Sequence, residues 1–238
     1  MVQNTPKPTI ENLKMALIAK EGSTYTPVPE GAYPARCVWV IDLGTQTSDG
    51  AFGRKVRQQI YVNWELIGET ADNGEPMTIG AFFSLSLTAK ANLRSTLESW
   101  RGRAFTADEL KGFDISKLLT APCIISVKHQ PKADGNGIRA TISGVMAPMK
   151  GQTIPPAVST ITLVDLDASD AKVKVDFLPE WLKKKIWESP EWGRINGFDT
   201  SPLPPSVLTS PTAVMYDAMK NGSPPRPFAP AEEEPLPF

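Results

Sequence analysis

The stretch at 54–68, RKVRQQIYVNWELIG, constrains the fold most because its apolar and polar residues alternate along almost its whole length. One set of alternate positions is apolar and holds Val56, Ile60, Val62, Trp64 and Leu66. The other set holds Lys55, Arg57, Gln59, Tyr61, Asn63 and Glu65. Successive side chains of a β-strand point to opposite faces, so this period of two predicts a strand with one buried face and one face in solvent.

Two more segments near this strand carry strand signals. Residues 33–44, YPARCVWVIDLG, are rich in β-branched and aromatic side chains and end in a glycine. Residues 77–86, MTIGAFFSLS, follow a turn at Asn73-Gly74, and a turn at Asp49-Gly50 separates the first two strands. Three successive strands joined by turns predict an antiparallel meander.

Helical spacing replaces the period of two after the third strand. In 87–102, LTAKANLRSTLESWRG, Thr88 is the expected N-cap and Gly102 the expected end of a helix. Thr106 and Glu109 fit the capping box of a second, short helix. Arg101 and Arg103 are expected to close the first helix rather than to bind phosphate.

The remaining strand signals complete the order of elements. Residues 121–130, APCIISVKHQ, and 138–146, IRATISGVM, flank a turn. The order predicts a mainly β fold: a five-stranded OB-fold Greek-key barrel with a helical insertion between strands 3 and 4. An open α+β sheet fits the same order. We favour the barrel because Gly80, in the third strand, would permit the sharp bend that such barrels need.

The 23 prolines define the domain organisation, since they concentrate before residue 35 and after residue 146. We expect an N-terminal extension with a short helix at 1–32 and the OB-fold domain at 33–150. A C-terminal extension at 151–200 should hold a strand and a Trp-rich helix, which would dock on the barrel or on a second subunit of a homodimer. Residues 201–238 read as a Pro-rich flexible linker and acidic tail.

Several classes of protein are not expected. No apolar run approaches the ~20 residues of a membrane-spanning helix, and the N-terminus does not resemble a signal peptide, so we expect a cytoplasmic protein without membrane contact. Cys37 and Cys123 lie in apolar strand segments, which predicts reduced, buried thiols. With His129 as the single histidine, neither a zinc site nor another cofactor is expected.

Basic and aromatic residues gather on the parts of the barrel that could bind single-stranded nucleic acid. The net charge of −1 argues against such a partner, but residues 31–150 hold 14 Lys and Arg against 11 Asp and Glu. OB barrels bind with strands 2 and 3 and the adjoining loops, where cations contact phosphates and aromatic rings stack on bases. The predicted DNA-binding residues are Arg54, Lys55, Arg57, Tyr61, Phe82, Lys128, Lys132 and Arg139. The alternative for each is an ordinary surface side chain.

The chain ends in AEEEPLPF, which is unusual for a solvated tail. A terminal Phe238 beside Pro237 could fill a pocket of a partner protein, and three glutamates would meet a basic rim around that pocket. The predicted partner-binding residues are Glu232, Glu233, Glu234, Pro237 and Phe238. The alternative is a solvated acidic end without a partner.

The segment LSLTAKANLRSTLESWRGRAFTADELKGFDISKLLTAPC resembles a family of bacteriophage single-stranded-DNA-binding proteins encoded with replication and recombination genes. The resemblance covers residues 33–150. Independently, EEEPLPF is similar to the acidic Pro-Phe tip of bacterial single-stranded-DNA-binding proteins. These resemblances imply binding to single-stranded DNA and recruitment of replication, repair and recombination enzymes through the tip, in the bacterial host cytoplasm.

Three hypotheses of function follow. The first is a non-catalytic, sequence-tolerant single-stranded-DNA-binding protein of phage replication and recombination. The second is a protein-interaction or assembly module without affinity for DNA, which the weak net charge favours. The third is a nuclease, although acidic residues such as Asp42, Glu65 and Asp108 show no spacing typical of metal ligands.

Overall fold

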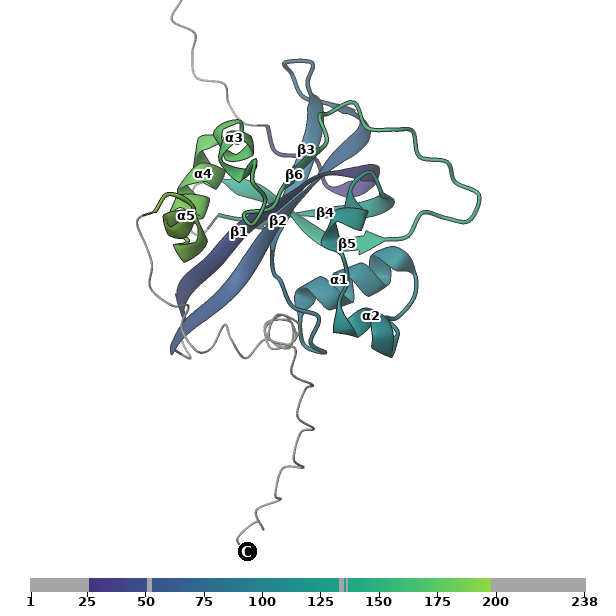
Figure 1. The fold of residues 1–238 in the computed structure, drawn as a ribbon. Helices are drawn as coiled ribbons and strands as arrows, with labels where there is room; N and C mark the ends of the chain where they lie inside the picture. The colour runs from purple at the N-terminus through teal and green to yellow at the C-terminus, as the bar shows by residue number, and fades with distance from the viewer. Residues whose placement is uncertain (1–25, 51–52, 133–134, 136, 198–238) are drawn as a thin grey trace, which may run out of the picture.

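Strands form most of the regular structure of the chain (Figure 1). The computed structural model describes residues 26–50, 53–132, 135 and 137–197. Its strands are β1 Gly31–Gly50, β2 Gly53–Thr70, β3 Pro76–Ser84, β4 Pro122–Pro131, β5 Ile138–Met146 and β6 Thr162–Val164. Its helices are α1 Asn92–Arg101, α2 Ala107–Lys111, the 3-10 helix η2 Ile115–Leu118, α3 Ala171–Asp176, α4 Glu180–Trp187 and α5 Pro190–Ile195.

One sheet contains all the strands, in the order β3-β2-β1-β4-β5, and its neighbours on this path are antiparallel. β6 pairs with β1 in parallel. Among the described residues the hydrogen-bonded path ends at β3 on one side and β5 on the other, so the paired strands form an open sheet. Residues of β3 and β5 nevertheless come within 8 Å of each other, Cα to Cα. The mainly β fold, with helices between the third and fourth strands, is confirmed.

The first strand is longer than predicted, because Gly44 does not end it. β1 continues to Gly50 through an irregularity in its pairing with β2 between Asp42 and Thr45. Gly44 has φ of 66°, a conformation that glycine adopts without strain. A Cβ atom at this position would also lie 2.7 Å from the side chains of Ser189 and Glu191. Gly44 thus lets a C-terminal segment approach the strand closely.

The main hydrophobic core lies against the face of β2 that the alternation predicted as buried. Trp64 and Leu66 are fully buried there, and Trp100 of α1 packs against Trp64 with ring centroids 5.6 Å apart. α1 contacts both β3 and β5, so the helix covers the space between the two ends of the strand path. Cys37 and Cys123 are free and buried in this core, as predicted, and burial raises the pKa of the Cys37 thiol to about 12.

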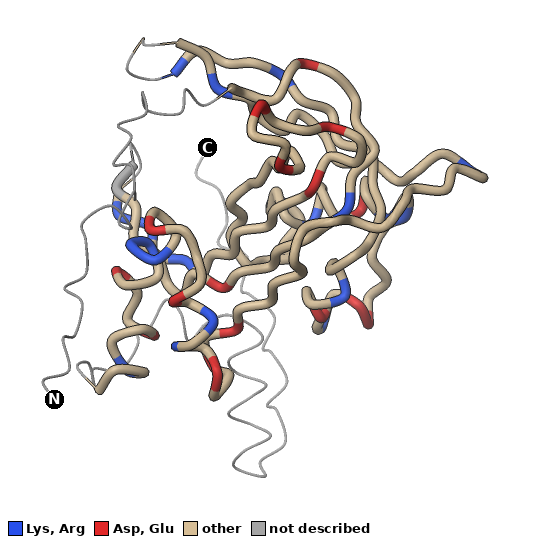
Figure 2. Tube along the Cα trace, turned by 90° about the horizontal axis from the view of Figure 1, so that it is seen from above, with Lys and Arg blue, Asp and Glu red and all other residues tan. Residues whose placement is uncertain are grey.

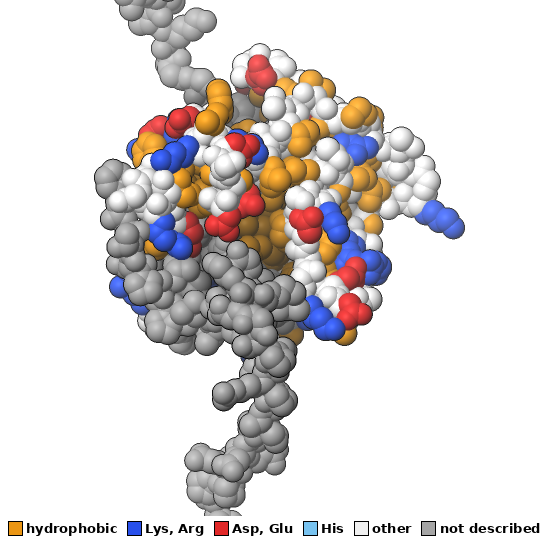
Figure 3. Space-filling view, in the orientation of Figure 1, with side chains coloured by type: hydrophobic (Ala, Val, Ile, Leu, Met, Phe, Trp, Pro, Cys, Tyr) orange, Lys and Arg blue, Asp and Glu red, His pale blue; other side chains and the backbone are white. Residues whose placement is uncertain are grey.

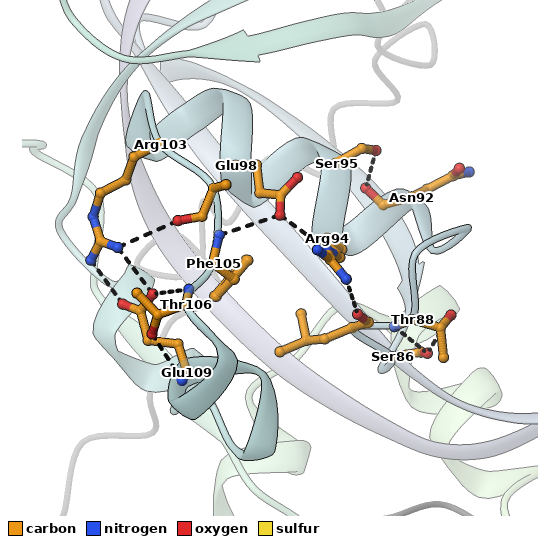
Figure 4. Close-up of polar contacts among 12 residues, drawn as sticks. Ser86, Thr88, Asn92, Arg94, Ser95, Glu98, Arg103, Phe105, Thr106 and Glu109 are labelled. Atoms are coloured by element: carbon orange, nitrogen blue, oxygen red, sulfur yellow. Dashed lines mark hydrogen bonds and ion pairs between the residues drawn. The ribbon is translucent and has the colours of Figure 1, made fainter. Parts of the chain in front are cut away.

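Residues 87–121, here called the helical insertion, connect β3 to β4. The predicted N-cap was wrong: α1 begins at Asn92 after Ala91, whose side chain does not cap the helix. Gly102 does end α1, with φ of 67°, and Thr106 and Glu109 do form a capping box at the start of α2. The segment is therefore defined mainly by its buried Leu93, Leu97 and Trp100 and by polar contacts between its two helices (Figure 4).

Residues 154–195, here called the C-terminal cover, lie on the opposite face of β1 and β2. They contain β6, which pairs with β1 in the middle of Figure 1, and α3–α5, which stand together at the left. Leu182 and Ile186 of α4 are fully buried against a second hydrophobic cluster that includes Ile41 and Leu43 of β1. The predicted strand and Trp-rich helix are thus both present, and the helix docks on the sheet.

Several predictions concern residues that the structure does not describe. The predicted N-terminal helix, the linker and the partner-binding residues Glu232, Glu233, Glu234, Pro237 and Phe238 lie outside the described residues. His129 lies in β4, and its Nε2 lies 2.8 Å from the carbonyl oxygen of Val28. Within the described ranges, no helix is both long and apolar enough to cross a lipid bilayer.

Candidate nucleic-acid interface

Three aromatic rings from three elements meet on the face beneath the C-terminal cover. Tyr61 of β2 is the direct pairing partner of Phe82 of β3, and their ring centroids lie 5.1 Å apart. Trp181 of α4 approaches both rings, at 5.2 Å from Tyr61 and 6.1 Å from Phe82, in edge-to-face geometry. Such arrangements are favourable for aromatic pairs. We call Tyr61, Phe82 and Trp181 the aromatic cluster.

The cluster presents two of its rings to solvent. Phe82 is 46% exposed and Trp181 is 47% exposed. The prediction that Phe82 and not Phe83 faces outward is confirmed, since Phe83 packs against the main core. Tyr61 is only 8% exposed, so its predicted place on an open polar face was wrong. The physical reason is that Trp181 and Phe82 lie against the Tyr61 ring, which shows that the C-terminal cover occupies this face.

Gly80 explains how Tyr61 fits on this face. A Cβ atom at Gly80 would lie 2.0 Å from the hydroxyl oxygen of Tyr61, so any other residue would displace the ring. Gly80 was predicted to allow a bend of the third strand. Its observed contact instead gives the Tyr61 side chain room to lie across β3.

Basic residues of β2 continue the face of the aromatic cluster toward the end of the β1–β2 hairpin. Lys55 and Arg57 have the same parity as Tyr61 along β2, and both are exposed. Arg57 pairs with Gln46, whose Nε2 donates to the carbonyl oxygen of Lys185 in α4 at 2.9 Å. Directly paired residues project from the same face, so Arg57 points to the side on which α4 lies. Arg54 is also exposed but has the opposite parity.

Lys185 connects these cations to the aromatic cluster. Its Nζ lies 5.9 Å from the ring centroid of Phe82, which is within the range of a cation–π contact. Lys183 and Lys184 precede it in α4. In Figure 2, Lys and Arg are frequent at the left, where α3–α5 and the end of the β1–β2 hairpin lie, although acidic residues are interspersed among them.

The predicted cations of the β4–β5 hairpin lie on another part of the sheet. Lys128, Lys132 and Arg139 are exposed, as a phosphate-binding role requires. Lys128 pairs with Thr141 and Arg139 with Gln130, so these residues are not on the strand pair that carries the aromatic cluster. The start of β5 still reaches this region, because Ala140 lines the same cavity as Tyr61 and Trp181.

The free cations of the candidate interface contrast with those of the helical insertion. Five predicted cations form no ion pair with any described residue: Arg54, Arg57, Lys128, Lys132 and Arg139. Arg103 donates to both carboxylate oxygens of Glu109, and Arg101 bonds to the same carboxylate (Figure 4 shows the Arg103 contacts). These hydrogen bonds, from Arg103 first, lower the pKa of Glu109 to about 2. Arg101 and Arg103 were predicted to close α1; their side chains instead join the end of α1 to Glu109 of α2.

Acidic groups gather where the C-terminal cover meets β1. Thr45 donates to the Glu191 carboxylate from its backbone nitrogen at 2.8 Å and from its hydroxyl at 2.7 Å. Burial raises the pKa of nearby Asp42 to about 6, helped by the charges of Glu191, Asp165 and Asp167 and opposed by a hydrogen bond from the Gly44 nitrogen. No group of His, Cys, Asp or Glu in the described part of the chain is arranged to hold a metal ion.

The sequence analysis was wrong about the surroundings of Asn63 and Glu65, and it did not identify Trp181 as a site residue. Asn63 and Glu65 were assigned to an exposed face of β2, yet both are buried. Glu65 accepts hydrogen bonds from the backbone nitrogens of Val158 and Ser159, which belong to the C-terminal cover. Trp181 was predicted to dock on the barrel or on a second subunit, and not to form part of a binding site. The signal that could have identified it is an amphipathic helix with tryptophans outside its apolar stripe.

Apolar surface and charge lie close together on this molecule. In Figure 3, hydrophobic side chains gather in the middle of the face shown, and Lys and Arg lie at both margins. A surface that combines aromatic rings with nearby cations can bind the bases and the phosphates of a single strand.

Comparison with protein-family models and with curated proteins does not identify the chain. No family model matches the chain, and no curated protein matches it. The resemblance to phage single-stranded-DNA-binding proteins therefore stays a prediction from the sequence.

Proposed function

We propose that the protein binds single-stranded DNA, without catalysis, on the face shared by β2, β3 and α4. The observation that carries this proposal is the solvent-exposed pair Phe82 and Trp181, which is continued by Lys185 and Arg57 on the same face. Stacking of a base on an aromatic side chain contributes ~1–3 kcal/mol and tolerates any sequence. The cations would neutralise phosphates, so binding should weaken as salt rises.

The proposed architecture is an OB barrel in which α1 fills the gap between β3 and β5. The strand order and the approach of β3 to β5 support this proposal. OB barrels use strands 2 and 3 for binding, which is the region of the aromatic cluster. The difference from a bare barrel is that the C-terminal cover contributes Trp181 and Lys185 to the surface.

The biological setting that we propose is phage DNA replication and recombination. The protein would coat single strands, and the tip with Glu232, Glu233, Glu234, Pro237 and Phe238 would recruit replication and recombination enzymes. This part of the proposal rests on the sequence resemblances alone. Co-purification of replication enzymes with the full chain, but not with a chain lacking residues 232–238, would test it.

The decisive experiment is fluorescence anisotropy of a labelled oligo(dT) and a matched duplex, titrated with the full chain at low and moderate salt. We expect salt-sensitive binding that prefers the single strand. Phe82→Ala should weaken binding about five- to a hundredfold, the loss of one stacked base. Phe177→Ala is the matched control, because Phe177 is 83% exposed but lies at the end of α3.

Absence of binding to either oligonucleotide would contradict the proposal and would favour a protein-interaction module without affinity for DNA. Exposed apolar side chains of the C-terminal cover, among them Trp187 and Phe177, are the observation on which that second candidate rests. Metal-dependent degradation of the oligonucleotide would instead favour the nuclease.

A further inference from the structure

A cavity of about 370 Å³ lies beside the aromatic cluster, at the centre of the candidate interface. Asn63 lines it, and this residue pairs with Trp39 on β1 and with Gly80 on β3. Because Gly80 has no side chain, β3 leaves room there for the Tyr61 hydroxyl and for the cavity. A cavity of this size falls within the ~300–1,000 Å³ range of small-molecule sites.

Three aromatic side chains, Trp39, Tyr61 and Trp181, line the cavity, and its walls come from two parts of the chain. Trp39 and Tyr61 belong to the sheet, whereas Pro179 and Trp181 belong to the C-terminal cover. Trp39 is held in place by a hydrogen bond from its Nε1 to the carbonyl oxygen of Thr160, at 3.2 Å. Flat apolar walls of this kind suit a planar ring that stacks against them.

Thr78 and Tyr61 bring hydroxyl groups to the lining of the cavity, and Asn63 brings an amide. This residue is only 3% exposed. Its Oδ1 accepts a long hydrogen bond from the Tyr61 hydroxyl at 3.4 Å, and its Nδ2 donates to no described residue. Because Asn63 lines the cavity, an acceptor on a ligand in the cavity could take a hydrogen bond from this Nδ2.

We infer that the cavity receives one unstacked nucleobase of a bound strand, and that Asn63 Nδ2 donates to a carbonyl oxygen of this base. The inference rests on the proposed function and deepens it, because it assigns one base of the strand a hydrogen-bonded site in the fold. Thymine accepts hydrogen bonds at its carbonyl oxygens, whereas difluorotoluene, a ring of nearly the same shape, accepts them only weakly. The protein should therefore bind oligo(dT) more tightly than a strand in which difluorotoluene replaces thymine, in part through Asn63.

The test compares labelled oligo(dT) with a strand of equal length in which difluorotoluene replaces thymine, with the full chain and its variants. Asn63→Leu keeps the size of the side chain and removes the donor. We expect the ratio of the difluorotoluene-strand Kd to the oligo(dT) Kd to fall about fivefold in this variant, the loss of one hydrogen bond. Asn92→Leu, at the exposed start of α1, should leave the ratio unchanged. Differences in strand stacking affect all variants equally and cancel.

The outcomes separate the inference from the proposal beneath it. Tight binding with an unchanged ratio in a folded Asn63→Leu variant would overturn the inference alone. No binding to either oligonucleotide by the wild-type chain would overturn both.

A second measurement needs no variant and so does not depend on folding of Asn63→Leu. The wild-type chain is photo-crosslinked to an oligonucleotide that carries 4-thiothymine, and the adducts are mapped by mass spectrometry. Adducts on Trp39, Tyr61 or Trp181 are expected. Adducts confined to residues outside the cavity would contradict the inference.

Discussion

The helical insertion and the C-terminal cover both pack helices on one sheet, yet they use their charged and aromatic residues in opposite ways. The insertion buries Trp100 in the main core and pairs Arg101 and Arg103 with Glu109. The C-terminal cover buries only aliphatic residues of α4, and leaves Trp181 half-exposed with Lys185 directed at Phe82.

This difference separates structural from functional use of the same residue types. A cation that already has a carboxylate partner must lose that partner before it can bind phosphate, so it contributes little to binding. A cation without one is available at once. We therefore expect the insertion to stabilise the fold and the cover to contribute to the proposed binding surface.

The largest expected effect contrasts the two tryptophans. Trp100→Ala should lower the free energy of unfolding by ~3–5 kcal/mol, because it empties a buried site and removes the hydrogen bond from Nε1 to the Pro122 carbonyl oxygen. Trp181→Ala should cost much less stability, since half of this side chain is in solvent, but should weaken DNA binding at least as much as Phe82→Ala. Urea denaturation and anisotropy measure the two quantities.

Two outcomes would contradict this difference between the helical insertion and the C-terminal cover. Equal losses of stability in both variants, or full DNA affinity in Trp181→Ala, would mean that the cover is a structural element like the insertion. The exposed Trp187 of the same helix offers a control substitution outside the aromatic cluster.

A second prediction uses pH, because the pKa values of two carboxyl groups are shifted in opposite directions: Asp42, on β1 where the C-terminal cover packs, and Glu109, in the helical insertion. The pKa of Asp42 is raised from 3.8 to about 6, so its burial destabilises the fold when it is ionised. That cost is absent below about pH 4, grows as pH rises, and is complete above about pH 6. Asp42→Asn should therefore raise the stability at pH 7, by up to ~3 kcal/mol, and have little effect at pH 4.

The carboxyl group of Glu109 should respond in the other direction. Its pKa is lowered from 4.5 to about 2, so its contribution to stability is present above 4.5 and is lost as pH falls toward 2. Denaturant unfolding of Asp42→Asn and Glu109→Gln between pH 3 and 8 would measure how the stability contribution of each carboxyl group changes with pH. A gain in stability from Asp42→Asn that did not change with pH would contradict the assignment of the effect to ionisation.

The smallest expected effect concerns single cations. Arg57→Gln should weaken DNA binding by ~1 kcal/mol or less and reduce the slope of log K against log salt by about 1, because one phosphate contact is lost. Arg103→Gln should leave the slope unchanged, since Arg103 bonds to Glu109. Salt titrations of both variants test this. Equal slopes in Arg57→Gln and the wild type would remove Arg57 from the interface.

Local patterns in the sequence predicted the elements well. The period of two in β2, the apolar spacing of α1 and the capping box at Thr106 each depend on neighbouring residues, and each was confirmed. The prediction for Phe82 also held, because alternation decides which of two adjacent phenylalanines faces inward.

The surroundings of the site could not be predicted in the same way. Tyr61, Asn63 and Glu65 look like solvent-facing residues because nothing near them in the sequence indicates that a distant segment covers them. The partners of Glu65, Val158 and Ser159, lie more than 90 residues away. A polar face of a strand can therefore mean a hydrated surface or a buried, hydrogen-bonded contact, and only the three-dimensional structure distinguishes them.

The parallel pairing of β6 with β1 has a consequence for the time at which the site forms. The bond from Trp39 to Thr160 joins residues 121 positions apart. Contacts of such long separation carry a large loop-closure cost and form late in folding, and during synthesis the second partner leaves the ribosome long after the first. We expect the strands and the helical insertion to assemble while the C-terminal cover is still being made. A nascent chain would then have a nearly complete core but no site, and would gain affinity for DNA only once its synthesis had passed α4.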